Sequence, residues 1–77
     1  MKTLHAIKTE PTFCNWIAMK FRAFTDVYME GQTCMVAQGP TTIRRPLIDQ
    51  AHYERQYREW VNRGCPMRPN GRPEEIR

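Results

Sequence analysis

The sequence predicts an α+β fold in which a small antiparallel sheet, made of an N-terminal strand plus a hairpin, packs against two helices and is followed by an extended C-terminal tail. Three observations lead to this fold class. Apolar residues recur at helical spacing over 46–63, a Glu-Gly pair separates two short apolar runs, and three prolines follow Gly64. The elements are expected in the order strand, helix, hairpin, helix and tail.

The first two elements are expected near the N-terminus. Residues 1–8 alternate weakly between apolar and polar, which favours a short edge strand. Thr9 or Thr12 is a suitable cap for a helix over about 12–24, in which apolar residues lie three and four positions apart: Phe13, Trp16, Ile17, Phe21 and Phe24. A strand stays open as an alternative, because residues 17–24 also alternate.

A β-hairpin is expected around the Glu30-Gly31 pair. Residues 26–29 and 32–38 flank this pair as two strands, and glycine supplies the positive φ that tight hairpin turns require. A polar connector over 41–45, which contains two adjacent arginines, then leads to the second helix.

The second helix is expected over 46–63. Pro46 suits a first helical turn, Asp49 suits the positive end of the helix dipole, and Gly64 ends the helix. One half of the helix surface is apolar and the other half is polar, so the helix is amphipathic. The apolar half contains Leu47, Ala51, Tyr53, Tyr57, Trp60 and Val61, and the polar half contains His52, Arg55, Glu59, Asn62 and Arg63.

Proline and arginine dominate residues 65–77. Pro66, Pro69 and Pro73 exclude regular structure over any length, so this segment is expected to be an extended basic tail. The chain therefore divides into a single small α+β domain over 1–64 and a tail over 65–77.

Length and composition indicate one small folded domain. The 77 residues are 40% hydrophobic and 26% charged, which is too apolar for a disordered chain. The longest apolar-leaning stretch, 13–24, contains charged residues and is shorter than the roughly 20 residues that span a bilayer, so no membrane partner is expected. The first residues lack the apolar core of a signal peptide, and a cytoplasmic location is expected.

The charge of the chain predicts an anionic partner. The formal net charge is +4, and nine of the twelve basic residues are arginine, whose planar guanidinium pairs bidentately with phosphate or carboxylate. Two aromatic residues at the edge of the apolar half of the second helix would anchor a partner. The expected partner-binding residues are Arg44, Arg45, Tyr53, Trp60, Arg63, Arg68 and Arg72. Two alternatives to partner binding stay open. One is that the arginines are only solvated, and the other is that Tyr53 and Trp60 cover the sheet.

The sequence shows no pattern typical of an enzyme. Its two histidines, His5 and His52, lie beside no evident nucleophile, and no glycine-rich phosphate loop occurs. Cys14, Cys34 and Cys65 lack the close spacing of zinc ligands and are expected to be buried thiols, although a zinc site with a histidine stays open. We expect no catalytic residue, no cofactor and no bound metal.

One stretch resembles a known kind of module. Residues 58–66, REWVNRGCP, followed by Arg68 and by 70–72, are similar to the recognition-helix end and wing of small phage excisionase or terminase-type winged-helix modules. The resemblance implies that this helix enters the major groove of DNA. It also implies that four arginines contact DNA: Arg58, Arg63, Arg68 and Arg72. The sequence departs from the pattern because no separate helix precedes Pro46 at short range.

These features predict a non-enzymatic small basic binding protein. Its size suits the compact proteins of phages and mobile elements that inhibit or redirect a host nucleic-acid-handling protein complex by steric occlusion. The expected partner is therefore a host protein or nucleoprotein complex, and a homodimer stays open. The alternative is a DNA-binding regulator of winged-helix or excisionase-like type, which a steep salt dependence of binding would reveal.

Overall fold

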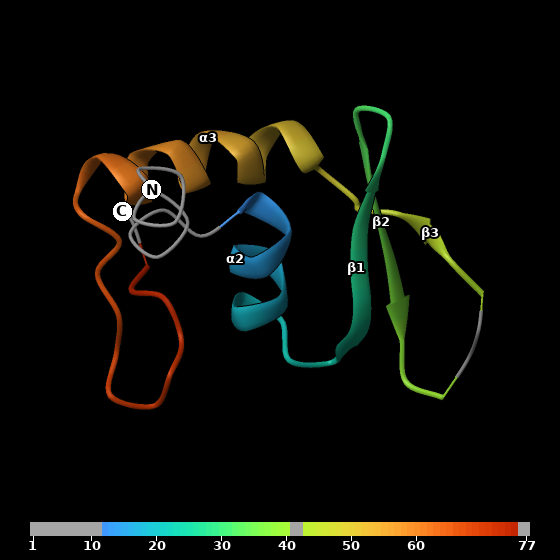
Figure 1. Cartoon of the computed structure of the whole chain (residues 1–77), viewed down its shortest axis with the longest axis horizontal. Coiled ribbons are helices and arrows are strands. Elements are labelled where there is room, and N and C mark those ends of the chain that lie inside the picture. Colours follow the sequence, from blue (N-terminus) through green and yellow to red (C-terminus); the bar gives the residue numbers. More distant parts are fainter. Residues whose placement is uncertain (1–11, 41–42, 76–77) are drawn as a thin grey trace, which may run out of the picture.

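Two helices and a three-stranded antiparallel sheet are formed by the residues that the structure describes. The computed structural model describes residues 12–40 and 43–75, in the order α2 (Phe13–Lys20), β1 (Phe24–Glu30), β2 (Thr33–Gln38), β3 (Arg45–Pro46) and α3 (Gln50–Asn62). The strand order is β1-β2-β3, and Figure 1 shows α2 beside β1 and beneath α3. The α+β class is therefore confirmed. The strand expected over 1–8 lies outside the described residues.

The expected first helix forms but is shorter than 12–24. The hydroxyl of Thr12 caps its N-terminus by accepting a hydrogen bond of 3.1 Å from the backbone N–H three residues later. The helix ends at Lys20, and the backbone of Phe21 has left the helical region with φ −119° and ψ 87°. Phe24 is already the first residue of β1. Residues 17–24, whose pattern suits both a helix and a strand, therefore contain the end of α2 and the start of β1.

β1 and β2 form the expected hairpin. Glu30 pairs with Thr33 across a two-residue turn in which Gly31 has φ 62°. This positive φ favours glycine, because it has no Cβ atom and adopts this conformation at lower cost than most other residues. β1 begins two residues earlier than expected, at Phe24, and a β-bulge lies between Phe24 and Asp26.

A third strand replaces the start of the expected second helix. Pro46 pairs with Met35 of β2 and α3 begins only at Gln50, so the prediction that Pro46 opens the helix is wrong. Proline is tolerated in β3 because an edge strand leaves some N–H positions without a partner. The backbone then turns at Asp49, which has φ 60° and precedes α3 without a side-chain capping hydrogen bond.

α3 is amphipathic, as expected. Trp60 is completely buried, whereas Tyr53, Tyr57 and Val61 are partly buried against the core. The helix ends at Asn62, just before the expected stop signal of glycine and proline. Within the described part of the chain, neither helix is long and apolar enough to cross a membrane.

The side chain of the first residue of α3 binds the hairpin. The amide oxygen of Gln50 accepts a hydrogen bond of 2.7 Å from the N–H of Cys34, and its amide nitrogen donates to the carbonyl oxygen of Gln32 at 2.8 Å. The neighbouring Ala51, which was expected in the apolar half, is exposed instead. α3 is therefore attached to the sheet by polar contacts at its start and to α2 by apolar contacts further along.

An aromatic cluster between the two helices forms much of the core. The ring centroids of Trp16 and Trp60 are 6.3 Å apart, and that of Tyr57 lies 5.9 Å from Trp16. The two tryptophans are 2% and 0% exposed. Ile17 of α2 and Val36 of β2 extend the buried cluster toward the sheet. Burial of such large rings supplies a major share of the hydrophobic stabilisation in so small a domain.

The expected extended tail is not confirmed, because beyond α3 the chain folds back as a loop beside α2 (Figure 1). The indole Nε1–H of Trp60 donates a hydrogen bond of 2.7 Å to the carbonyl oxygen of Pro66, which also accepts from the N–H of Glu74 at 3.0 Å. Met67 pairs with Pro73 in an antiparallel bridge, and Pro73 is buried. Proline permits this arrangement because its carbonyl oxygen still accepts hydrogen bonds.

Replacing Trp60 by Phe should destabilise the domain more than replacing Trp16 by Phe. Both changes remove the same part of a buried indole, but only the Nε1–H of Trp60 has a hydrogen-bond partner among the described residues. We expect Trp60→Phe to lose about 1 kcal/mol more free energy of unfolding than Trp16→Phe. Urea denaturation followed by far-UV circular dichroism measures the difference. Equal losses would contradict a stabilising role for the bond to Pro66.

Candidate functional site

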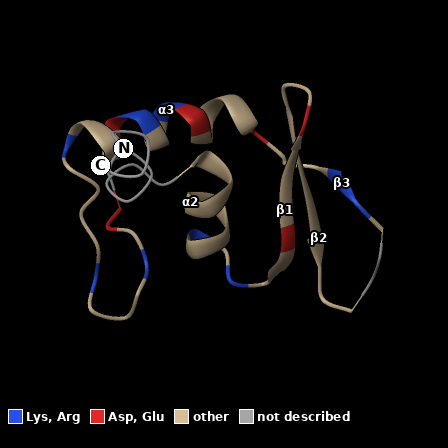
Figure 2. Ribbon diagram, in the orientation of Figure 1, with Lys and Arg blue, Asp and Glu red and all other residues tan. Residues whose placement is uncertain are grey.

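The residues expected to bind a partner do not form one surface. Arg44 and Arg45 lie in or beside β3, whereas Arg68 and Arg72 lie in the tail loop. Figure 2 shows these two basic segments at opposite ends of the molecule, whose longest extent is 34 Å. The two groups of arginines therefore belong to separate surfaces.

Two of the expected arginines form ion pairs within the protein. Arg44 binds the Asp26 carboxylate of β1 with N–O distances of 3.0 and 3.3 Å, and its guanidinium lies 5.7 Å from the ring centroid of Tyr28. Arg63 binds the carboxylate of Glu59, one turn earlier in α3, at 3.4 Å. Both pairs are exposed, so each adds little to stability. Each pair nevertheless reduces the positive charge that is available to a partner.

The two expected aromatic anchors differ in their exposure. Trp60 is fully buried, so it is a core residue and its ring offers no surface to a partner. The ring of Tyr53 packs edge-on against Phe21, with centroids 5.3 Å apart. Tyr53 is only partly buried, and it lines a small apolar pocket together with Arg45.

The tail loop and the end of α2 enclose a cleft with a volume of about 260 Å³. We call it the basic cleft, and it is lined by Lys20, Arg68, Asn70, Arg72, Pro73 and Glu75. Arg68 and Arg72 are among the residues expected to bind a partner. Lys20 was not among the expected residues. It lies far from Arg68 and Arg72 in the sequence, and only the folded-back tail brings the three side chains together.

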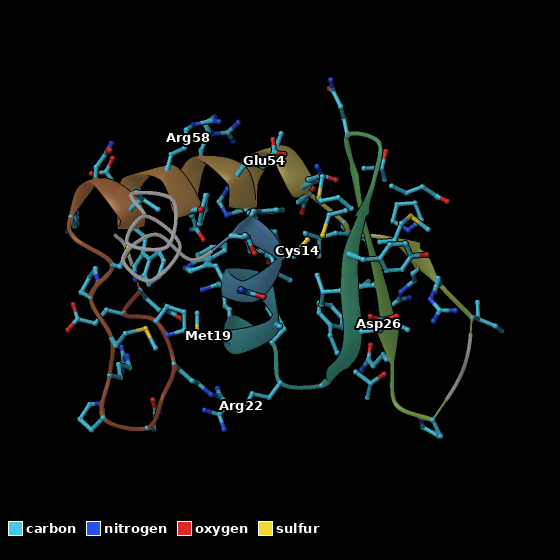
Figure 3. The ribbon with its side chains drawn as sticks, viewed as in Figure 1. Cys14, Met19, Arg22, Asp26, Glu54 and Arg58 are labelled. Atoms are coloured by element: carbon cyan, nitrogen blue, oxygen red, sulfur yellow. The ribbon has the colours of Figure 1, made fainter. Side chains whose placement is uncertain are left out.

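Arg22 fixes the tip of the tail loop. Its Nη2 donates a hydrogen bond of 2.7 Å to the carbonyl oxygen of Asn70, and Figure 3 shows its side chain reaching toward the loop. Gly71 at the tip has φ 83°, and a Cβ atom there would lie 3.1 Å from the Arg22 guanidinium. The side-chain oxygen of Asn70 accepts a hydrogen bond of 3.0 Å from the N–H of Arg72. These contacts hold the backbone that carries Arg68 and Arg72.

Positive charge dominates the basic cleft. Among the described residues, three basic side chains line it and Arg22 stands beside it, against one lining carboxylate, that of Glu75. The Lys20 ammonium lies 3.8 Å from this carboxylate and 5.4 Å from the ring centroid of Trp16. The side chain of Lys20 is 17% exposed and that of Glu75 is 63% exposed, so the lysine is the more buried of the two. Such converging cations bind phosphate or carboxylate groups.

The implied winged-helix arrangement would place α3 and the loop after it on one DNA-facing side. The loop does return, through the bridge between Met67 and Pro73. Figure 3, however, shows Arg58 on the side of α3 that faces away from α2, whereas the tail loop is held beside the end of α2 by Arg22. Arg58 and the basic cleft therefore face different sides.

Two of the three cysteines contact each other between α2 and β2. The thiols of Cys14 and Cys34 are hydrogen-bonded to one another, and no disulfide is formed. Burial raises the pKa of both thiols. For Cys34, burial and the neighbouring Cys14 together raise the pKa to about 11. Among the described residues, no group of three or more Cys, His, Asp or Glu side chains is placed to hold a metal ion.

Comparisons with protein-family models, with curated proteins and with solved structures found no match for this chain. The functional proposal therefore rests on the described residues. The basic cleft is the concave site that combines two expected arginines with a cation from α2.

The free energy of unfolding should fall as the pH rises from about 9 to about 11. The Cys34 thiol has an ordinary pKa of 9.0, which applies to the unfolded chain, but a pKa of about 11 in the folded protein. Between these values the unfolded state has released a proton that the folded state retains, which favours unfolding. Urea denaturation at several pH values should show a steeper loss for the wild type than for Cys34→Ala. The same slope in both proteins would contradict the raised pKa.

Proposed function

We propose that this chain is a non-enzymatic binding protein that docks its basic cleft on an acidic surface of a nucleic-acid-handling protein complex. It thereby inhibits or redirects that complex by steric occlusion. The observation that carries the proposal is the basic cleft itself, where cations from α2 and from the tail loop converge. Because Arg22 already fixes the backbone of the loop, little conformational freedom is lost on binding.

The mixture of charges around the cleft favours a protein partner over a nucleic acid. Glu75 lines the cleft, and the exposed Glu74 precedes it in the tail loop. A nucleic-acid backbone carries one negative charge per phosphate and would be repelled by these carboxylates. A protein surface carries both signs of charge and can complement both the cations and the carboxylates.

Direct nucleic-acid binding is the second candidate, and the loop after α3 is the observation that favours it. Arg68 and Arg72 stand on a loop closed by the bridge between Met67 and Pro73, as a wing stands after a recognition helix. Phosphate contacts would make binding strongly dependent on salt. If Lys20, Arg68 and Arg72 each contact a phosphate of duplex DNA, the affinity would fall roughly 40-fold between about 50 and 200 mM salt.

Replacing Arg68 and Arg72 together by Ala should abolish capture of the partner while leaving the melting temperature nearly unchanged. Both side chains are exposed, so their removal costs little stability, but the basic cleft loses most of its charge. The measurement is an affinity pull-down from nuclease-treated lysate with the tagged protein at physiological salt. We expect the wild type to retain a protein partner under these conditions.

The matched control is Arg55→Ala/Arg58→Ala, which removes the same charge from the exposed face of α3. This variant should capture the partner as the wild type does. Equal loss of capture by both double variants would show that net charge, rather than the cleft, is responsible. Recovery of only nuclease-sensitive material would favour the second candidate instead.

A further inference from the structure

A small apolar pocket lies beside β3, and none of the described residues that line it also lines the basic cleft. Its volume is about 130 Å³. Its apolar walls include Phe21, Phe24, Leu47, Ile48 and Tyr53. This volume is close to the roughly 150 Å³ of an apolar cavity that binds benzene in another protein, so the pocket is large enough for one aliphatic side chain of the size of leucine.

An exposed isoleucine and an arginine stand at the rim of this pocket. Ile48 is 70% exposed, and an exposed apolar side chain beside an open apolar pocket is typical of an interaction surface. Arg45 donates a hydrogen bond of 3.3 Å to the neutral side-chain oxygen of Gln38. Among the described residues no carboxylate pairs with Arg45, whereas the adjacent Arg44 is paired with Asp26. The pocket therefore combines an apolar cavity with a cation that lacks a counter-charge there.

We propose that this pocket docks a protein segment in which a carboxylate flanks a large aliphatic side chain. The aliphatic side chain fills the space between Phe24, Leu47 and Tyr53, and the carboxylate pairs with the Arg45 guanidinium. Neither feature is selective alone, because an apolar cavity accepts any side chain of suitable size and an exposed arginine attracts any anion. Together they select acidic-aliphatic segments, which adds a second contact surface to the one in the basic cleft.

Two small probes separate the apolar contribution from the charged one. N-acetyl-leucine carries the aliphatic side chain next to a carboxylate, and N-acetyl-leucinamide carries the same side chain next to a neutral amide. In an NMR titration of the full ¹⁵N-labelled chain, N-acetyl-leucine should shift the amide resonances of Leu47 and Ile48, with a Kd on the order of 1 mM for so small a ligand. N-acetyl-leucinamide should bind about fivefold more weakly.

Arg45→Gln is the test variant and Arg44→Gln is its matched control. Arg45→Gln should weaken N-acetyl-leucine binding about fivefold and leave N-acetyl-leucinamide binding unchanged. Arg44→Gln removes the same charge from the neighbouring position. Because Arg44 is already paired with Asp26, the affinity for N-acetyl-leucine should change by less than about twofold. The Arg68→Ala/Arg72→Ala variant should bind both probes as the wild type does, which keeps a failure here distinct from a failure of the basic cleft.

Three results would overturn the proposal. The first is the absence of any shift at the pocket with N-acetyl-leucine, and the second is equal affinity of the wild type and Arg45→Gln for this probe. The third is a dimer, detected by sedimentation velocity, that dissociates on Ile48→Asp. A second copy of the chain would then be the occupant of the pocket.

Discussion

The hydrogen bond from the Trp60 indole to the Pro66 carbonyl joins the core of the domain to its basic cleft. The Trp60 ring is fully buried against Trp16, so its Nε1–H points in one fixed direction. A buried N–H without an acceptor costs free energy comparable to a lost hydrogen bond, which favours keeping the Pro66 carbonyl where it is. The same carbonyl accepts the N–H of Glu74, so the loop is closed at the point where it meets the core.

The basic cleft depends on this closure because its walls come from distant parts of the chain. Lys20 stands at the end of α2, whereas Arg68 and Arg72 stand on the tail loop. Because like charges repel, other contacts must offset the repulsion between these three cations. Arg22 donates to the carbonyl oxygen of Asn70, and the Lys20 ammonium lies near both the Glu75 carboxylate and the Trp16 ring. Cations that the fold brings together in a concave site concentrate positive potential there, which favours an anionic partner.

Elements decided by local interactions were predictable from the sequence, whereas those decided by distant contacts were not. The Thr12 cap and the positive φ of Gly31 each act within a few residues. Pro46 was misleading because a first helical turn and an edge strand both tolerate proline, and pairing with β2 decides between them. The helical pattern placed Trp60 on the apolar face but could not show that α2 covers it. Lys20 could not be assigned to the cleft, because only the folded tail brings it there.

Amide hydrogen exchange in the tail loop, measured by NMR on the wild-type protein, is the most direct measurement. The N–H groups of Arg68, Gly71 and Glu74 donate hydrogen bonds within the loop, to Arg72, Arg68 and Pro66 respectively. If the loop is held by the core, these three amides should exchange at least about tenfold more slowly than in an unstructured peptide. Exchange at the rate of an unstructured peptide would contradict this structure of the tail, and with it the existence of a preformed basic cleft.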